Sequence, residues 1–254
     1  MPLMSGSRFM SETFKGYGIT HLFVMPYVLN PVLRDCEKLG IRRVMCHSEK
    51  GAAYMADGYA RATGRCGVAI VTSGPGVTNA VTGIATAYTD SIPLVVLTGQ
   101  VATSAIGNDA FQETDILGMT LGIVKHSYLV REVNDLPRIM NEAFHLATSG
   151  RPGPVLVDLP KDVVSTECET DFTDEFHLPG YAPPARGSAD DLEKAAELIS
   201  LSRKPLLYVG AGAIISQASR QVIGFAEKLQ APVTTTLLGK GAFPENHPLS
   251  VGML

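Results

Sequence analysis

The stretch HSEKGAAYMADGYARATGRCGVAIVTSGPGVTNA, residues 47–80, contains the pattern that decides the fold. Its first part has small or apolar residues at the positions i, i+3, i+4, i+7 and i+8 that share one face of a helix. These residues are Ala52, Met55, Ala56, Tyr59 and Ala60. An apolar run at 68–72 then predicts a strand covered on both faces, and a second helix is predicted from about Gly76. Helix, strand and helix in this order predict part of a parallel α/β sheet.

The same alternation continues on both sides of this stretch. Short, nearly continuous apolar runs predict strands at 20–25, 41–46, 68–72, 93–98, 127–130 and 154–159. A further helix is predicted over 136–148, followed by Gly150 as a helix stop. The sequence therefore predicts an α/β fold, with a mostly parallel six-stranded sheet and helices on both of its faces.

A polar, proline-rich segment separates this pattern from a second one. We predict a first domain over 1–165, a linker over 166–188 and the start of a second, Rossmann-like α/β domain over 189–254. The second pattern consists of helices near 189–202 and 216–230 and strands at 205–210 and 232–236. Because so few βα units cannot bury both faces of a sheet, this central domain is expected to be incomplete.

Composition narrows the class of protein. Hydrophobic residues make up 45% of the 254 residues and charged residues 18%, which favours a folded chain with a sizeable core. The net charge of −4 and the absence of a basic run argue against a nucleic-acid partner. No apolar run reaches the roughly 18 residues of a membrane span. Four cysteines without a metal-binding spacing are typical of reduced thiols, so a cytoplasmic location is expected.

Glu49 is the first candidate for chemistry, because it follows a predicted strand and opens a predicted helix. Open α/β sheets bind ligands at the carboxyl ends of their strands. The alternative is that Glu49 only complements the helix dipole, which contributes about 0.3–1 kcal/mol.

Three further segments between predicted elements carry candidate residues. In TSGPGVTNA (72–80) the glycines allow a ligand to approach the backbone, or they form a plain connection. In GNDAFQETD (107–115), Asn108 or Asp109 is predicted to cap a helix that holds Gln112 and Glu113, which a surface helix would also explain. In GRPGPVLVDLPKD (150–162), two cations, Arg151 and Lys161, bracket a strand as anion ligands or as solvent-facing ends.

Taken together and in this order, these motifs resemble the pyrimidine-binding domain of the thiamine-diphosphate-dependent enzymes, of the acetolactate synthase large-subunit type. VTTTLLGKGAFPENHPLSVGML (233–254) is similar to part of the central domain of that family. The resemblance covers nearly the whole chain. It implies carboligation or decarboxylation of 2-oxo acids, most of all transfer between two pyruvate molecules to give 2-acetolactate, in branched-chain amino acid biosynthesis.

The resemblance also assigns roles to residues. The equivalent of Glu49 hydrogen-bonds the aminopyrimidine N1′ of thiamine diphosphate and so helps N4′ to take the proton from thiazolium C2. The remaining assignments are Gln112 and Lys161 as catalytic residues, Pro75, Gly76 and Asn79 as cofactor-binding residues, Phe111 on the substrate side, and Arg151 as a contact to FAD where FAD is bound. No metal ligand is assigned in this chain.

Other expectations follow from the family's architecture. Mg²⁺ and the diphosphate are expected to be held by a domain that has no counterpart here, since no GDG motif occurs in the sequence. The isolated chain is therefore expected to be inactive. It is interpreted as a longer chain cut short, as one subunit of a split enzyme, or as a degenerate relative. The completed enzyme is expected to be a homodimer or homotetramer, or to use a separate diphosphate-domain subunit.

The sequence departs from the family pattern near the reacting centre. A GxPGG stretch is replaced by VMPYV at 24–28, and a usual proline is replaced within Ala102-Thr103-Ser104. These changes keep two alternatives open within the resemblance: another 2-oxo acid decarboxylase or sulfoacetaldehyde acetyltransferase, and a non-catalytic relative that dimerises or regulates. A nicotinamide-dependent dehydrogenase would rest on VGAGA (209–213) alone, which lacks the third glycine of the dinucleotide turn.

Overall fold

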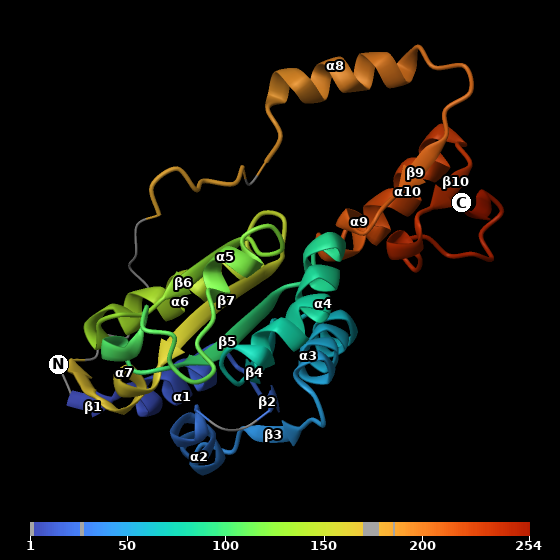
Figure 1. Ribbon diagram of the computed structural model, residues 1–254. Coiled ribbons are helices and arrows are strands. Elements are labelled where there is room, and N and C mark those ends of the chain that lie inside the picture. The colour runs from blue at the N-terminus through green and yellow to red at the C-terminus, as the bar shows by residue number, and fades with distance from the viewer. Residues whose placement is uncertain (1–2, 26–27, 170–177, 185) are drawn as a thin grey trace. The chain divides into compact units, whose positions relative to one another are not determined.

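The structure, a computed structural model, describes residues 3–25, 28–169, 178–184 and 186–254. The chain divides into two compact units, Met1–Pro183 and Pro184–Leu254. Each unit is an α/β structure in its own right (Figure 1).

The first unit is built on a six-stranded sheet in the order β3-β2-β4-β5-β7-β6, in which every neighbouring pair is parallel. The strands are β2 (His21–Val24), β3 (Arg42–Met45), β4 (Gly67–Val71), β5 (Leu94–Gln100), β6 (His126–Leu129) and β7 (Pro154–Pro160). Each end of each strand lies within two residues of its predicted position. The predicted sheet is confirmed, because continuous apolar runs such as LVVL and VLV are fully buried in the central strands.

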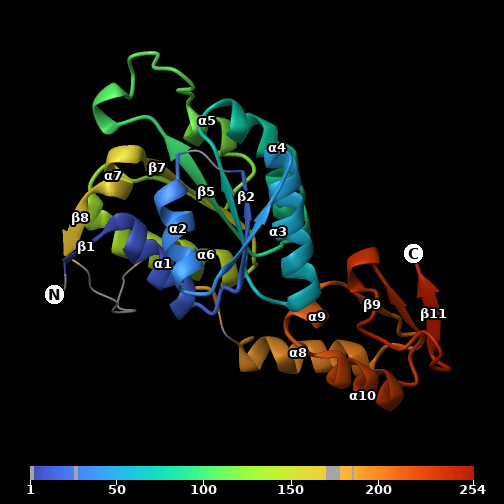
Figure 2. The ribbon, with the colours of Figure 1, turned by 90° about the horizontal axis from the view of Figure 1, so that it is seen from below.

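Helices cover both faces of this sheet (Figure 2). One face packs against α1 (Gly6–Gly16), α2 (Asn30–Lys38), α6 (Leu136–Thr148) and α7 (Lys161–Ser165). The other face packs against α3 (Glu49–Thr63), α4 (Pro75–Asp90) and α5 (Ile116–Thr120). Helices α3 and α4 lie very close together, because a Cβ atom on Gly83 would come within 2.6 Å of the Cβ of Ala53. This close packing therefore fixes the position of the first residues of α3 relative to the first residues of α4.

One prediction for the first unit needs correction. No helix forms around Gln112 and Glu113: this segment is a series of turns, and α5 begins later, with Asp115 as its N-cap. The carboxylate of Glu113 instead accepts hydrogen bonds from the backbone N–H groups of Gly107 and Ala110, which closes a loop and competes with a helix.

Part of the predicted linker packs on the first unit. Strand β8 (Glu167–Glu169) pairs antiparallel with β1 (Leu3–Ser5), so the chain is still structured after residue 166. The hydroxyl of Tyr181 donates a hydrogen bond to the backbone oxygen of Ser149 at 2.9 Å and accepts one from Lys125 at 3.0 Å. Residues 170–177 and 185 of the predicted linker lie outside the described residues.

The second unit contains a three-stranded parallel sheet in the order β11-β10-β9. Its elements are α8 (Ala189–Ser200), β9 (Leu207–Val209), α9 (Gly212–Ile215), α10 (Ser219–Leu229), β10 (Val233–Thr235) and β11 (Ser250–Met253). Its small core comprises Val209, Ala226, Val233, Ala242 and Phe243. The predicted helix over 216–230 starts later, at Ser219, and β11 was not predicted because SVGM has no apolar run.

Candidate active site

Glu49 is the first residue of α3 and follows the carboxyl end of β3 after a three-residue connection. Ser48 caps the helix, since its hydroxyl accepts a hydrogen bond from the N–H of Gly51 at 3.0 Å. The carboxylate of Glu49 is half-buried, and its Oε2 accepts a hydrogen bond from Nδ2 of Asn79, on α4, at 2.7 Å. An acid and an amide predicted separately from sequence are thus brought together by two helices.

Gly76 has no side chain and lies beside the Glu49–Asn79 pair. A Cβ atom at this position would lie 3.1 Å from Oε1 of Glu49 and only 2.4 Å from the methyl carbon of Thr72. The neighbouring Pro75 opens α4, where its missing N–H is tolerated. The hydroxyl oxygen of Thr72 is buried and, among the described residues, has no hydrogen-bond partner. This place therefore offers an acid, an amide and an unused hydroxyl to a flat polar ring such as an aminopyrimidine.

A cavity of about 400 Å³ opens next to this place. Its wall includes Phe111 and Gln112, from the motif at 107–115, and Lys161, from the motif at 150–162. Phe111 is 84% exposed, so an aromatic ring stands at the rim of the cavity without a packing partner large enough to bury it. The remaining lining residues are Val28, Ser73, Gln100, Val101, Ala102, Ala105 and Ala110.

The sequence prediction missed two polar residues, Gln100, which lines this cavity, and its buried partner Asp158. Gln100 ends β5 and lines the cavity, and its Nε2 donates a hydrogen bond to Oδ2 of Asp158, on β7, at 2.9 Å. Thr98 donates to the other carboxylate oxygen at 2.6 Å. Burial raises the pKa of Asp158 to about 6, although these hydrogen bonds act in the opposite direction. The available signal was the presence of buried polar residues in two mostly apolar strands, Thr98 and Gln100 in β5 and Asp158 in β7.

The altered segment at 102–104 is tied to the helix that begins with Lys161. The backbone N–H of Thr103 donates to Asp162 at 3.1 Å and its hydroxyl donates at 2.5 Å. Burial acts to raise the pKa of Asp162, but the hydrogen bonds from Thr103 outweigh it and hold this pKa below its ordinary value. One wall of the cavity is thereby fixed to the start of α7.

The other altered segment, at 24–28, also reaches the cavity. Val28 lines it, and a Cβ atom on Gly99 would lie 2.5 Å from the Cβ of Val28. Pro26 and Tyr27 lie outside the described residues. A branched apolar side chain therefore occupies the space where the family pattern has a glycine-rich stretch.

Arg151 is not brought to this place. It precedes β7 and so lies at the amino ends of the parallel strands, whereas Glu49 and Lys161 follow carboxyl ends. Its side chain is exposed and donates hydrogen bonds to the hydroxyl of Ser91 at 2.6 Å and to the backbone oxygen of Thr89 at 3.3 Å. Arg151, which was predicted as a FAD contact, therefore lies apart from the acid and the cavity.

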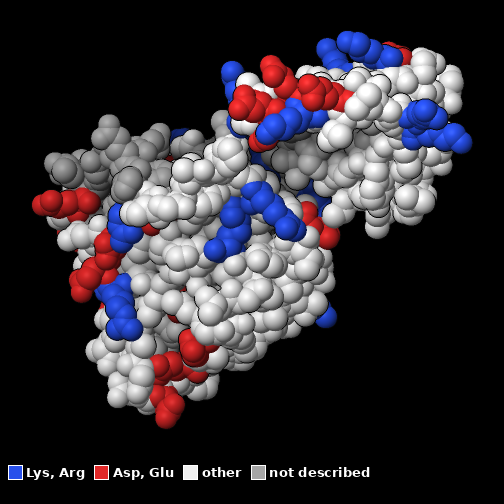
Figure 3. All heavy atoms as spheres, turned by 90° about the horizontal axis from the view of Figure 1, so that it is seen from above, with Lys and Arg blue, Asp and Glu red and all other residues white. Residues whose placement is uncertain are grey.

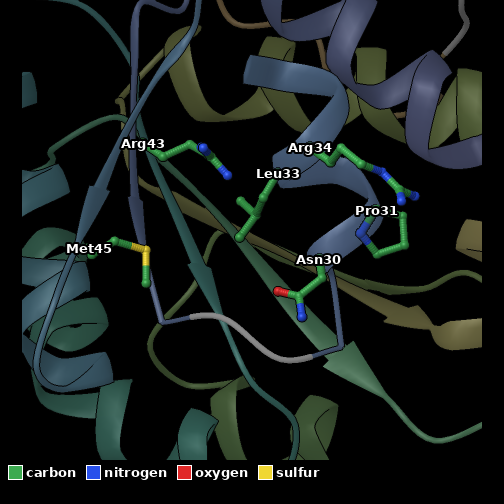
Figure 4. A pocket seen from close by; sticks show the side chains of 6 residues that line it. All are labelled: Asn30, Pro31, Leu33, Arg34, Arg43 and Met45. Carbon is green, nitrogen blue, oxygen red and sulfur yellow. The ribbon is translucent and has the colours of Figure 1, made fainter. Parts of the chain in front are cut away.

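A second cavity, of about 420 Å³, lies between α2 and β3. Asn30, Leu33, Arg34, Arg43 and Met45 line it together with Pro31 (Figure 4). Arg43 pairs with Glu37 at 2.7 Å. None of the residues predicted as site residues lines this cavity. On the face that Figure 3 shows, basic and acidic side chains are mixed.

Comparison with protein families identifies the class of both units. Residues 4–119 match the thiamine pyrophosphate enzyme N-terminal TPP binding domain, and residues 192–254 match the thiamine pyrophosphate enzyme central domain. The chain therefore carries the N-terminal and central domains of a thiamine pyrophosphate enzyme.

Within that class the chain is similar to acetolactate synthases. It is 50% identical to the acetolactate synthase of Arthrospira platensis over 99% of this chain, and 45% identical to the acetolactate synthase isozyme 3 large subunit of Escherichia coli (strain K12) over all of it. The chain spans 45% of the length of each of these relatives.

A solved structure agrees with the fold. An X-ray structure of a protein from Mycobacterium smegmatis, described as thiamin diphosphate-dependent, matches with a TM-score of 0.84 at 28% identity, over 99% of this chain and 48% of that chain. No helix in the described part of the chain is both long and apolar enough to cross a membrane.

Proposed function

We propose that the complete protein is a thiamine-diphosphate-dependent transferase that joins two 2-oxo acid molecules, with formation of 2-acetolactate from pyruvate as its reaction. It would serve branched-chain amino acid biosynthesis. The observation that carries this proposal is the Glu49–Asn79 pair beside Gly76 and the cavity of about 400 Å³. The names of the similar proteins support the same reaction.

The residues at this place fit an aminopyrimidine. Glu49 offers a carboxyl group to a ring nitrogen, Gly76 leaves room for the flat ring, and the unpartnered hydroxyl of Thr72 offers a further hydrogen bond. Thiamine diphosphate, when bound, supplies the carbon nucleophile that attacks the 2-oxo acid. Glu49 exchanges a proton with the ring nitrogen, and Asn79 holds the carboxylate in position for that exchange.

The cavity suits a small 2-oxo acid. The ammonium group of Lys161 provides a positive charge for the substrate carboxylate, and Gln112 provides hydrogen-bonding groups for its carbonyl. Phe111 provides an apolar surface at the rim, which helps to exclude water when the cavity is closed.

The remaining assignments are part of the same proposal. Arg151 is proposed to contact FAD, and Mg²⁺ is proposed to be held by ligands outside this chain. The active protein is proposed to be a cytoplasmic homodimer or homotetramer, or to use a separate subunit for the diphosphate. Residues 1–165 are proposed as the pyrimidine-binding domain, 166–188 as the linker, and 189–254 as part of the central domain.

A second candidate has support at the cavity itself. Val28, which packs on Gly99, and the Ala102–Ser104 segment both depart from the acetolactate synthase pattern and alter the wall. A different acceptor, as in decarboxylation or acetyl transfer to phosphate from sulfoacetaldehyde, would accommodate such a change. Product analysis of the complete enzyme with pyruvate, and separately with sulfoacetaldehyde and phosphate, distinguishes the two reactions.

The proposal is tested through the acid. In the complete enzyme, Glu49→Gln is expected to slow C2 H/D exchange of bound thiamine diphosphate by at least about 100-fold, because general acid–base catalysis contributes 10²–10⁴-fold. The control is Glu197→Gln, on the exposed helix α8, which should exchange like the unaltered protein. Rapid exchange in Glu49→Gln, with the cofactor bound, would refute the assigned role.

A further inference from the structure

Three hydrogen-bonded polar side chains, Thr98, Gln100 and Asp158, lie inside the sheet, and Gln100 lines the cavity of about 400 Å³. Their exposed fractions are 0%, 4% and 1%. Buried polar groups are costly unless they are paired, and an ionised carboxylate is the most costly of them. A hydrophobic residue would be the ordinary choice at position 158, because its neighbours Val157 and Leu159 are fully buried.

The three side chains share the sheet face that the cofactor-side helices cover. On β7, Leu156 packs with α3 and α4, and Asp158 points to the same face because side chains alternate along a strand. On β5, Val96 packs in that same cluster, so Thr98 and Gln100 point there too. Thr98 and Asp158 are direct register partners. The group therefore lies at the carboxyl ends of the strands, where Glu49 also lies.

Both ends of the Gln100 carboxamide are engaged. Its Oε1 accepts a hydrogen bond from the N–H of Val101 at 2.8 Å, and its Nε2 donates to Asp158 at 2.9 Å. A carboxylate can only accept, and a backbone N–H can only donate. Turning the carboxamide over would place oxygen against carboxylate and nitrogen against N–H, and both bonds would be lost.

We propose that Asp158 is a positioning residue, which holds the carboxamide of Gln100 in one orientation in the cavity wall so that Gln100 presents fixed hydrogen-bonding groups to the carbonyl or carboxylate of a 2-oxo acid. The substrate class in this inference rests on the proposed function. The coupling of Asp158 to Gln100 does not depend on the proposed function, and it is tested separately.

The coupling is tested by nuclear magnetic resonance. The chain contains five glutamines, at positions 100, 112, 217, 221 and 230, so ¹⁵N-glutamine labelling gives few side-chain signals, and Gln100→Leu assigns the relevant pair. The Gln100 amide signals are expected to titrate with a midpoint near 6, the pKa of Asp158. Asp158→Asn should abolish this titration.

Two matched variants control the assignment. Asp57→Asn removes another buried aspartate, on α3, and should leave the titration of Gln100 unchanged. Glu49→Gln removes the carboxyl group at the same end of the sheet and should also leave it unchanged. A Gln100 signal that does not titrate, or one that still titrates in Asp158→Asn, overturns the coupling.

The positioning role is tested in the complete enzyme. Asp158→Leu removes the acceptor while it keeps the number and branching of the side-chain heavy atoms, and it is expected to raise KM for pyruvate about tenfold or more while the affinity for thiamine diphosphate changes less than about threefold. A merely structural role would reduce the folded fraction, which lowers kcat and leaves KM unchanged. A lowered kcat with an unchanged KM would overturn the proposal.

An unaltered enzyme that turns over no 2-oxo acid would refute the proposed function instead. The amide titration would still show whether Asp158 and Gln100 are coupled.

Discussion

The backbone oxygen of Gln112 lies 2.2 Å from the position that a Cβ atom would occupy on Gly74, a separation that real Cβ atoms do not show. Both residues have left-handed backbones, with φ of +48° at Gly74 and +62° at Gln112. The loop before α4 and the turn before α5 therefore meet backbone to backbone. Because the first leads directly into Gly76 at the start of α4 and the second lines the cavity, this contact sets the distance between the Glu49 site and the cavity wall.

Gly74→Ala should destabilise the chain. The added methyl group requires the turn to move, and it places an alanine in a backbone region that L residues rarely adopt. We expect the free energy of unfolding to fall by about 2 kcal/mol or more, measured by urea denaturation. Gly58→Ala is the matched control: nothing lies within 4 Å of its added Cβ, and in the interior of α3 it should raise stability by up to about 1 kcal/mol. Equal effects of the two substitutions would contradict the close contact.

The sheet could be predicted from sequence because its central strands are apolar on both faces. Runs such as LVVL at 94–97 leave few alternatives to a buried strand, and the flanking turn residues limit its length. Strand β11 has no such run: it is four residues long, and mostly exposed, so that only its pairing with β10 defines it.

The site was less predictable where tertiary contacts determine the positions of its side chains. The interaction of Glu49 with Asn79 depends on the close packing of α3 and α4, which a sequence pattern does not measure. The helix predicted around Gln112 fails because Glu113 bonds to backbone N–H groups of its own loop. Asp158 escaped notice because a single acid in an apolar strand has no motif, and only the register with β5 reveals its partner Thr98.

Arg61 joins the two helices that carry the acid and the amide. It pairs with Asp57 on α3 at 2.7 Å and with Asp90 at the end of α4 at 2.6 Å. Arg61→Met would leave the buried carboxylate of Asp57 without its partner, so we expect a loss of about 2–3 kcal/mol in the free energy of unfolding. Asp90→Asn, which removes the more exposed pair, should cost less than about 1 kcal/mol. Urea denaturation of both variants checks the ranking, and the reverse order would contradict it.

Asn79→Asp should disturb the acid directly. The new carboxylate would stand about where the amide now donates to Glu49 at 2.7 Å, and two like charges at this partly exposed position repel by about 1 kcal/mol or more. We expect stability at pH 7 to fall below that of Asn79→Ser, which removes the amide without adding charge. The difference between the two variants should shrink in 1 M salt, where charges are screened. A difference that is absent at low salt would show that Asn79 and Glu49 are not in contact.

The raised pKa of Asp158 makes stability depend on pH. Burial lifts this pKa from 3.8 to about 6 in the folded chain, so the folded state holds its proton more tightly than the unfolded state. The resulting contribution is fully present below about pH 4 and is lost as the pH rises through 6. Relative to Asp158→Asn, whose side chain does not titrate, the unaltered chain should therefore lose about 2–3 kcal/mol of stability between pH 4 and pH 7. Urea denaturation of both proteins at several pH values measures this difference, with Asp57→Asn as the matched buried aspartate. Parallel stability curves for the unaltered chain and Asp158→Asn would contradict this prediction, because they would mean that Asp158 has the same pKa in the folded and the unfolded chain.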